Sequence, residues 1–180
     1  MRISPQTIKK VRRQPSRPAF TIVEIIVVLL VVAVGLVGIL SLITQNIQNQ
    51  SYDKNSLIAN HLAQEGVELV RRVRDSNWKA NVAFNTNLAA TIGQTYNYYM
   101  DYQDALPLAH TGGATELVLN QDGNGFYQDA AKGGNASIFS RLLTIKLLDA
   151  DSLQVDAILT WSDHGHNFSY DLQTLLYDWH

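Results

Sequence analysis

The chain has 180 residues, of which 46% are hydrophobic, and it contains no cysteine. This length suits one domain, and the missing cysteine excludes disulfide staples, thiol catalysis and cysteine-ligated metals. The formal net charge is −2, but the charges are unevenly distributed. Six of the 14 basic residues and none of the 16 acidic ones lie within 1–19, so the remainder of the chain, its body, is acidic. An acidic body argues against direct binding of nucleic acid, which needs exposed basic groups.

The first 43 residues divide into a basic leader, 1–19, and an apolar segment, 20–43, which reads FTIVEIIVVLLVVAVGLVGILSLI. As a helix this segment extends about 36 Å, enough to cross a hydrocarbon core of about 30 Å. Backbone polar groups in lipid must pair internally, so the segment is predicted to be a transmembrane helix. The basic leader predicts a cytoplasmic N-terminus and an acidic body outside the membrane.

Three interpretations of this N-terminal region are open. An ordinary secretory signal needs a small-residue cleavage site after the apolar run, whereas 41–46 read SLITQN. A permanent, uncut anchor has no need of Glu24, whose carboxylate near the edge of a membrane helix is costly unless it is neutralised or paired. The third interpretation is a subunit in which that charge meets a partner.

The hexapeptide AFTIVE at 19–24, followed by the apolar run, resembles the processing motif of type IV pilin-like precursors. The resemblance implies that a prepilin peptidase cuts between Ala19 and Phe20 and methylates the new amine of Phe20. It also implies that Glu24 meets the N-terminal amine of a neighbouring subunit during assembly, and an ammonium opposite the carboxylate would offset its cost in lipid. Ala19 stands where this family usually has Gly.

The next segment, 44–78, is predicted to continue the helix as an amphipathic half. Ile58, Leu62, Leu69 and Val73 recur at helical spacing, as on a helix that covers a sheet. Residues 62–75 also resemble the second half of the long helix in V-type minor pilins and I-type secretion pseudopilins.

The remaining residues, 79–180, are predicted to form a globular head, which makes the chain an α+β protein with a long helix on an antiparallel sheet. Residues 80–113 are predicted to be an irregular loop with one short strand, and its tyrosines to pack against the helix, with a binding surface as the alternative. A hairpin is predicted at the QDGN turn of 121–124. Strand patterns occupy 115–120, 125–128, 138–148, 154–161 and 168–179.

Two turn sequences offer weak candidate ligands for calcium, Asp122 with Asn124 and Asp149 with Asp151. Neither has the alternating oxygen ligands, central glycine and distal glutamate of an EF-type loop, so turns are the favoured interpretation. The adjacent Ser-His-Asp composition at 162–164 lacks the spacing of a catalytic triad. No metal, cofactor or enzymatic activity is predicted.

These features predict a non-enzymatic structural subunit of a type IV pilus or of a type II secretion-like pseudopilus, most similar to a minor pilin or pseudopilin. The resemblance implies four partners: prepilin peptidase, other pilin or pseudopilin subunits, an inner-membrane assembly platform and the lipid bilayer. It places the chain in the bacterial inner membrane and then in an extracytoplasmic filament. The alternative is an uncut, membrane-anchored binding or adhesin module that does not polymerise.

Overall fold

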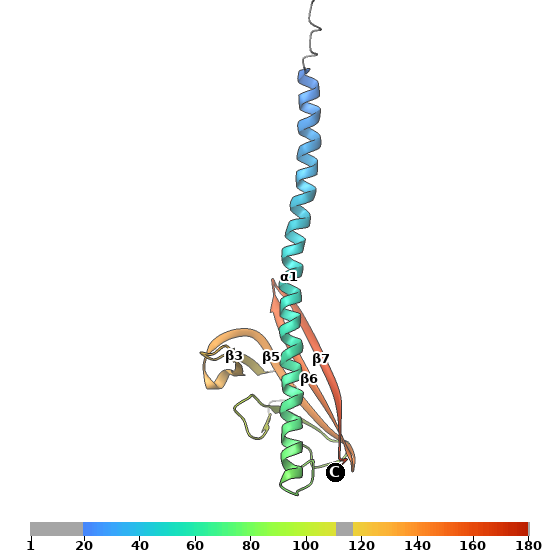
Figure 1. The fold of residues 1–180 in the computed structure, drawn as a ribbon, viewed down its shortest axis with the longest axis vertical. Coiled ribbons are helices and arrows are strands. Elements are labelled where there is room, and N and C mark those ends of the chain that lie inside the picture. Colours follow the sequence, from blue (N-terminus) through green and yellow to red (C-terminus); the bar gives the residue numbers. More distant parts are fainter. Residues whose placement is uncertain (1–19, 111–116, 180) are drawn as a thin grey trace, which may run out of the picture. The chain divides into compact units, whose positions relative to one another are not determined.

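A computed structural model describes residues 20–110 and 117–179. The described chain forms two compact units that divide between Asn46 and Ile47, and one helix, α1 (Ile22–Lys79), contributes to both. The basic leader and Ala19 lie outside the described residues. The α+β class is confirmed, since one long helix is followed by an antiparallel sheet (Figure 1).

The first unit consists of the early turns of α1. The helix passes through Gly35 and Gly38 without a break, and a Cβ added at either glycine would have open space around it. The Thr44 hydroxyl donates to the Leu40 carbonyl oxygen at 3.0 Å, a bond that lets a polar side chain sit on a helix without an outside partner. The apolar run thus forms one continuous helical segment.

The second unit is the head, in which a curled antiparallel sheet packs on α1. Its central strand is β5 (Asn135–Asp149), which pairs along one edge with β6 (Ser152–Asp163), and β6 pairs with β7 (His166–Tyr177). The other edge of β5 is shared. Its first half pairs with β3 (Leu117–Gln121) and its second half with β1 (Thr95–Tyr99).

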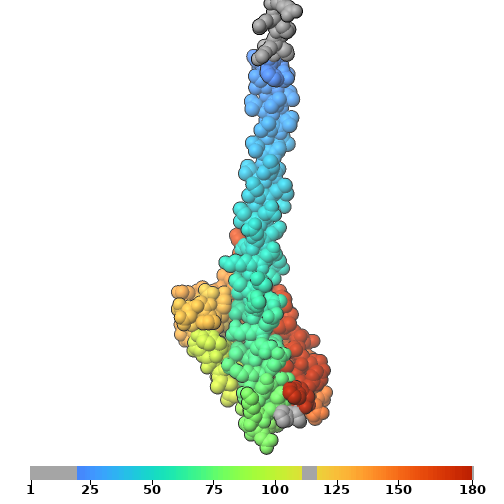
Figure 2. Space-filling view, in the orientation of Figure 1, coloured from blue at the N-terminus to red at the C-terminus, as the bar shows by residue number. Residues whose placement is uncertain are grey.

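Three short elements complete the described head. Strand β2 (Leu108–Ala109) pairs with β1, and β4 (Tyr127–Asp129) pairs with β3. A single 3-10 turn, η1 (Ala130–Lys132), leads into β5. Figure 2 shows the region of β3 and β4 on one side of the second half of α1 and β7 on the other. The face of α1 that points to the viewer is uncovered in this view.

The core lies between the inward face of α1 and the sheet. Ala59, Ala63 and Val70 are fully buried on the helix, and the opposing Leu143 is fully buried on β5. Each large apolar side chain buried in this way contributes about 1.5–3 kcal/mol. A Cβ at Gly66 would stand 2.7 Å from Leu143 Cδ2, so this glycine allows α1 to approach β5 closely.

A buried charge joins the helix to the sheet. The Arg141 side chain, 3% exposed, donates from Nη1 to the Leu62 carbonyl oxygen at 2.8 Å and from Nη2 to the Met100 carbonyl oxygen at 2.6 Å. Glu65 Oε2 lies 3.7 Å from Arg141 Nη1. One guanidinium therefore ties α1, β5 and the segment after β1 together.

A second buried charge organises the loop after β1. Asp101 is 1% exposed, and its carboxylate accepts from the backbone N–H groups of Gln103 and Asp129, each at 2.9 Å. Lys132 Nζ donates to both Asp101 oxygens at 2.7 and 2.8 Å and to Asp104 Oδ1 at 2.7 Å. Burial raises the pKa of Asp101, but the bonds from Lys132 and the two amides outweigh it and hold that pKa below its ordinary value.

The predicted elements correspond closely to the observed ones. The helix ends at Lys79, one residue beyond the expected end, and the three long strand patterns became β5, β6 and β7. Residues 115–116 of the first hairpin strand lie outside the described residues, and its remainder is β3. The expectation of one short strand in 80–113 was incomplete, because the described part of that segment contains both β1 and β2.

The tyrosine cluster is part of the packed head. Tyr96 and Tyr98 pack against the core that α1 and the sheet share, and the Tyr98 hydroxyl donates to the Leu88 carbonyl oxygen at 2.7 Å. Tyr99 hydrogen-bonds His110, and the Tyr102 hydroxyl donates to Asp122 Oδ2 at 2.8 Å. Packing, the favoured interpretation, therefore accounts for Tyr96 and Tyr98, whereas Tyr102 remains 37% exposed.

Candidate functional site

The start of α1 positions Glu24. Thr21 immediately precedes the first helical residue, and its Oγ1 accepts from the Glu24 backbone N–H at 3.2 Å. Thr21 therefore caps the helix, and Glu24 is its third residue, the arrangement of the T-x-x-E capping box. The carboxylate lies in the first turn, where the helix dipole favours a negative charge by about 0.3–1 kcal/mol.

Sequence reasoning missed this capping role, although Thr21 and Glu24 three residues apart are its signature. The capping bond uses the backbone N–H of Glu24, while its carboxylate gains the charge–dipole attraction, which requires no second subunit. The charge–dipole gain is nevertheless smaller than the few kcal/mol that an ionised carboxylate costs within a membrane helix.

The rest of this segment is apolar on every side. Ile22 is 78% exposed and Ile43 is 50% exposed, and the large apolar side chains between them are all exposed within this chain. α1 is the one described helix that is long and apolar enough to cross a membrane. A helix without a polar face is stable only when lipid or other apolar helices surround it.

A shallow furrow runs along the first turns of α1. Phe20, Glu24 and Val28 line one side at intervals of four residues, and Ile25 and Leu29 line the other. Rows of side chains at this interval form the ridges and grooves through which helices pack on one another. The furrow is thus lined by four apolar side chains and one carboxylate, that of Glu24.

Of the two residues at the expected cleavage position, the structure describes Phe20. Phe20 is 76% exposed and precedes the first helical residue, Ile22. Ala19, and with it the expected peptide bond to be cut, lies outside the described residues.

The two weak candidates for calcium occupy separate turns. Asp122 and Asn124 lie in the β3–β4 hairpin, where Asp122 Oδ1 accepts from the N–H groups of Asn124 and Phe126 at 2.8 and 2.9 Å. A hydrogen bond from Tyr102 is the main cause that lowers the pKa of Asp122. These bonds give the carboxylate a structural role in closing the turn.

Asp149 and Asp151 lie at the other end of β5, in the turn to β6. Asp149 Oδ1 accepts from the Asp151 N–H at 2.9 Å, and this bond is the main cause that lowers the pKa of Asp149. The Asp151 carbonyl oxygen accepts from the Asp178 N–H at 2.8 Å. The two candidate pairs are therefore not brought together, and within the described residues no three His, Asp or Glu side chains form a metal-binding group.

The turn between β6 and β7 contains the histidines. His164 and Gly165 adopt positive φ angles of 50° and 80°. Asp163 Oδ2 accepts from Ser51 Oγ at 2.8 Å and Asn55 Nδ2 at 3.1 Å, and Asp163 Oδ1 lies 2.7 Å from His164 Nδ1. The hydrogen bond from Ser51 is the main cause that lowers the pKa of Asp163. This aspartate therefore attaches the turn to α1.

The comparisons with known proteins add no relative. No protein-family model, curated protein sequence or solved structure matches this chain. The assignment of the chain therefore depends on its own residues, and what they establish is a long, apolar N-terminal helix packed on a C-terminal antiparallel sheet, which is the general pilin-like architecture.

Proposed function

We propose that this chain is a non-enzymatic filament subunit, made as a precursor, cut before Phe20 and assembled through α1 into a type IV pilus or a type II secretion-like pseudopilus. The observation that carries the proposal is Glu24, a carboxylate in the first turn of an otherwise apolar and exposed helix. A minor pilin or pseudopilin is favoured over the main shaft subunit, because the chain has no cysteine to close a C-terminal loop.

The charges at the start of α1 are incompletely compensated within one subunit. The helix dipole compensates only part of the cost of an ionised carboxylate in lipid. Cleavage before Phe20 creates an ammonium group beside the positive end of the helix dipole, where a cation is unfavourable. A neighbouring subunit then supplies each charge with a partner of opposite sign, while the furrow beside Glu24 receives an apolar helix.

The first experiment is mass spectrometry of the membrane-extracted chain, expressed with and without a prepilin peptidase. We expect a product that begins at Phe20 and carries one additional methyl group only when the peptidase is present. The variant Ala19→Lys, which places a charge at the cut, should stay uncut. A chain that still begins at Met1 beside an active peptidase would favour the uncut anchor.

The second experiment tests assembly. Since the sequence has no cysteine, Ile25→Cys introduces a unique thiol at the furrow, and with an added mild oxidant it reports subunit contacts as disulfide-linked dimers. Adding Glu24→Gln should abolish these dimers, whereas adding Glu68→Gln, the same chemical change on the exposed part of α1, should leave them intact. Equal crosslinking in both variants would contradict a role of the Glu24 carboxylate in assembly.

A further inference from the structure

A cleft of roughly 320 Å³ lies between α1 and the turn that joins β6 to β7, and both of its sides belong to the head. Its lining combines amide, aromatic, imidazole and carboxylate groups. They come from Gln48, Asn49 and Tyr52 on α1 and from Asp163, His164, His166 and Phe168 on the β6–β7 hairpin. Side chains alternate between the faces of a strand, so His166 shares with Phe168 the face of β7 that packs on α1.

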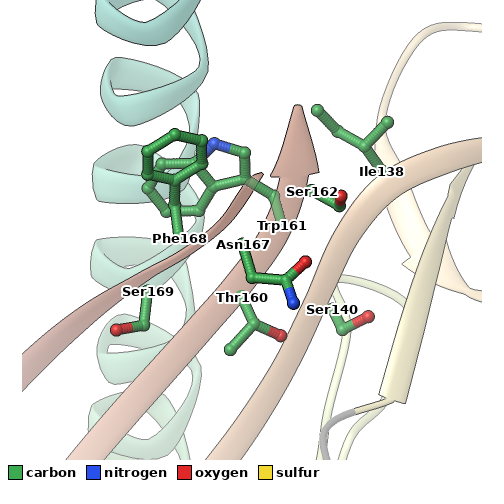
Figure 3. Close-up of a pocket in the computed structure, with 8 residues that line it drawn as sticks. All are labelled: Ile138, Ser140, Thr160, Trp161, Ser162, Asn167, Phe168 and Ser169. Carbon is green, nitrogen blue, oxygen red and sulfur yellow. The ribbon is translucent and has the colours of Figure 1, made fainter. Parts of the chain in front are cut away.

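Stacked aromatic rings hold one wall of the cleft in place. Figure 3 shows the rings of Trp161 and Phe168 stacked on one another beside α1, away from the polar ends of Ser140 and Thr160, and their centroids are 5.5 Å apart. The ring of Tyr52 packs on Phe168 with a centroid separation of 5.0 Å, and Tyr52 remains 43% exposed. A cation over the exposed part of this ring would gain a cation–π attraction.

Asp163 is the one acidic residue in this lining. Its Oδ2 accepts from Ser51 Oγ at 2.8 Å and from Asn55 Nδ2 at 3.1 Å, so α1 holds the carboxylate in a fixed orientation. Its Oδ1 lies 2.7 Å from His164 Nδ1, and because a carboxylate oxygen has two lone pairs, Oδ1 can accept one more hydrogen bond. A fixed carboxylate near an exposed aromatic ring is a combination that selects an ammonium group.

Polar N–H groups form a second part of the lining. The side chains of Gln48, Asn49 and His166 make no hydrogen bond within the described residues. Amide and imidazole N–H groups donate to anionic oxygens such as those of a phosphate. Gln48 and Asn49 precede Tyr52 by four and three residues, so these donors lie about 4.5–6 Å from Tyr52 along the axis of α1. The cleft thus combines donors for a phosphate with a nearby site for an ammonium group.

The helix side of the cleft begins shortly after the apolar segment ends. Gln48 follows Ile43, the last residue of that segment, by five residues, or about 7.5 Å of helix. The polar head groups of a bilayer add about 5–8 Å beyond the hydrocarbon core on each side. Along α1 the donors for a phosphate come first and the ammonium site follows. An ethanolamine phospholipid carries its phosphate and its ammonium in the same order, counted from its acyl chains.

We propose that this cleft binds the head group of phosphatidylethanolamine from the membrane in which α1 inserts. The carboxylate disfavours lipids whose head group carries only a negative charge. It also distinguishes ethanolamine from choline, since a primary ammonium donates a hydrogen bond to Asp163 Oδ1 whereas a quaternary one has no N–H group. Such binding rests on the membrane insertion that the proposed function includes, and it requires neither cleavage nor assembly.

Native mass spectrometry of the full chain measures the preference. The chain is purified in a maltoside detergent, which contains neither ammonium nor phosphate, and is incubated with equal amounts of phosphatidylethanolamine and phosphatidylcholine that have identical acyl chains. Neither lipid has a net charge, so the basic leader attracts both equally. We expect about tenfold more adducts of the ethanolamine lipid, the effect of one charge-assisted hydrogen bond.

Two variants and a matched control locate the site. Asp163→Asn should remove the preference, and Tyr52→Leu should weaken binding of both lipids, because its ring attracts either ammonium group. Asp171→Asn, the same chemical change on the exposed side of β7, should keep the preference.

Three results would each overturn the proposal. The first is equal or greater binding of the choline lipid by the unmodified chain. The second is an unchanged preference in Asp163→Asn, with circular dichroism showing that this variant is folded. The third is the same loss of preference in Asp171→Asn. Processing at Phe20 can succeed or fail in each of these cases, so the two proposals are tested separately.

Discussion

Asp101 connects the loop after β1 to the β4 hairpin, and replacing it by asparagine removes its charge at almost constant shape. The carboxylate accepts two backbone N–H bonds and two from Lys132. Asparagine keeps one acceptor oxygen and turns an NH₂ group toward donors that need an acceptor. Each buried donor left without a partner costs about 1–3 kcal/mol.

The expected loss of stability follows from these bonds. The ammonium of Lys132 is partly exposed, so water replaces much of its lost attraction and that pair adds only about 0–1 kcal/mol. Asp101→Asn should therefore destabilise the head by about 2–4 kcal/mol. For a domain of this size that loss lowers the unfolding midpoint by roughly 6–16 °C.

Low pH should remove the difference in unfolding free energy between the unmodified chain and Asp101→Asn. Because the folded state lowers the pKa of Asp101, its contribution is fully present above the ordinary pKa near 4 and is lost as pH falls through the folded pKa. We therefore expect a constant gap between the unmodified chain and Asp101→Asn from about pH 5 to pH 8, and a narrowing gap below about pH 4.

Tryptophan fluorescence of the full chain in detergent gives the measurement, since Trp78, Trp161 and Trp179 all lie in the head and none lies in the apolar segment 20–43. The matched control is Asp171→Asn on the exposed side of β7, which should change stability by less than about 0.5 kcal/mol. If Asp101→Asn matched this control, or if the gap grew as pH fell, the assignment of a buried, stabilising carboxylate would be wrong.

Two other changes test the contact between α1 and the rest of the head. Gly66→Val should destabilise the head by about 1–3 kcal/mol in urea unfolding, because the valine side chain would overlap Leu143. An unchanged unfolding midpoint would show that the neighbouring side chains rearrange without cost. Asn77→Ala should cost about 1–3 kcal/mol and speed amide exchange in 80–90, because the Asn77 amide bonds the carbonyl oxygens of Phe84 and Thr86 at 3.0 and 2.8 Å; protection equal to that of the unmodified chain would contradict this role.

The long helix and the long strands were predictable because the apolar residues of each recur at the spacing of that type of structure. The apolar stripe of α1 and the alternation along β6 are local patterns, and both correspond to the buried faces observed. Strands β1 and β2 carry no such signal, since a strand of five residues rich in tyrosine and one of two residues are too short to show a period. Pairing to the distant β5 is what makes β1 a strand.

The sequence predicted only part of the interactions that Arg141 makes. Arg141 interrupts an inward row that is otherwise apolar at Phe139, Leu143 and Ile145, and such a lone charge signals a buried partner. Its partners are main-chain carbonyl oxygens of Leu62 and Met100, which no side-chain pattern identifies. The polar row of Ser140, Thr160 and Ser169 was equally hidden, because these residues become neighbours only through the register of three strands.

The central position of β5 has a consequence for the order of folding. Strands β1 and β3 pair with β5, yet both are synthesised before it, and neither has another long partner among the described strands. A nascent head therefore cannot fold stepwise from its N-terminal side, and the inward face of α1 stays uncovered until β5 and β6 have emerged. Such late, non-local pairing slows folding and prolongs exposure of aggregation-prone surface. In the proposed membrane-inserted state, the anchored first turns of α1 would also keep these unfinished chains apart from one another.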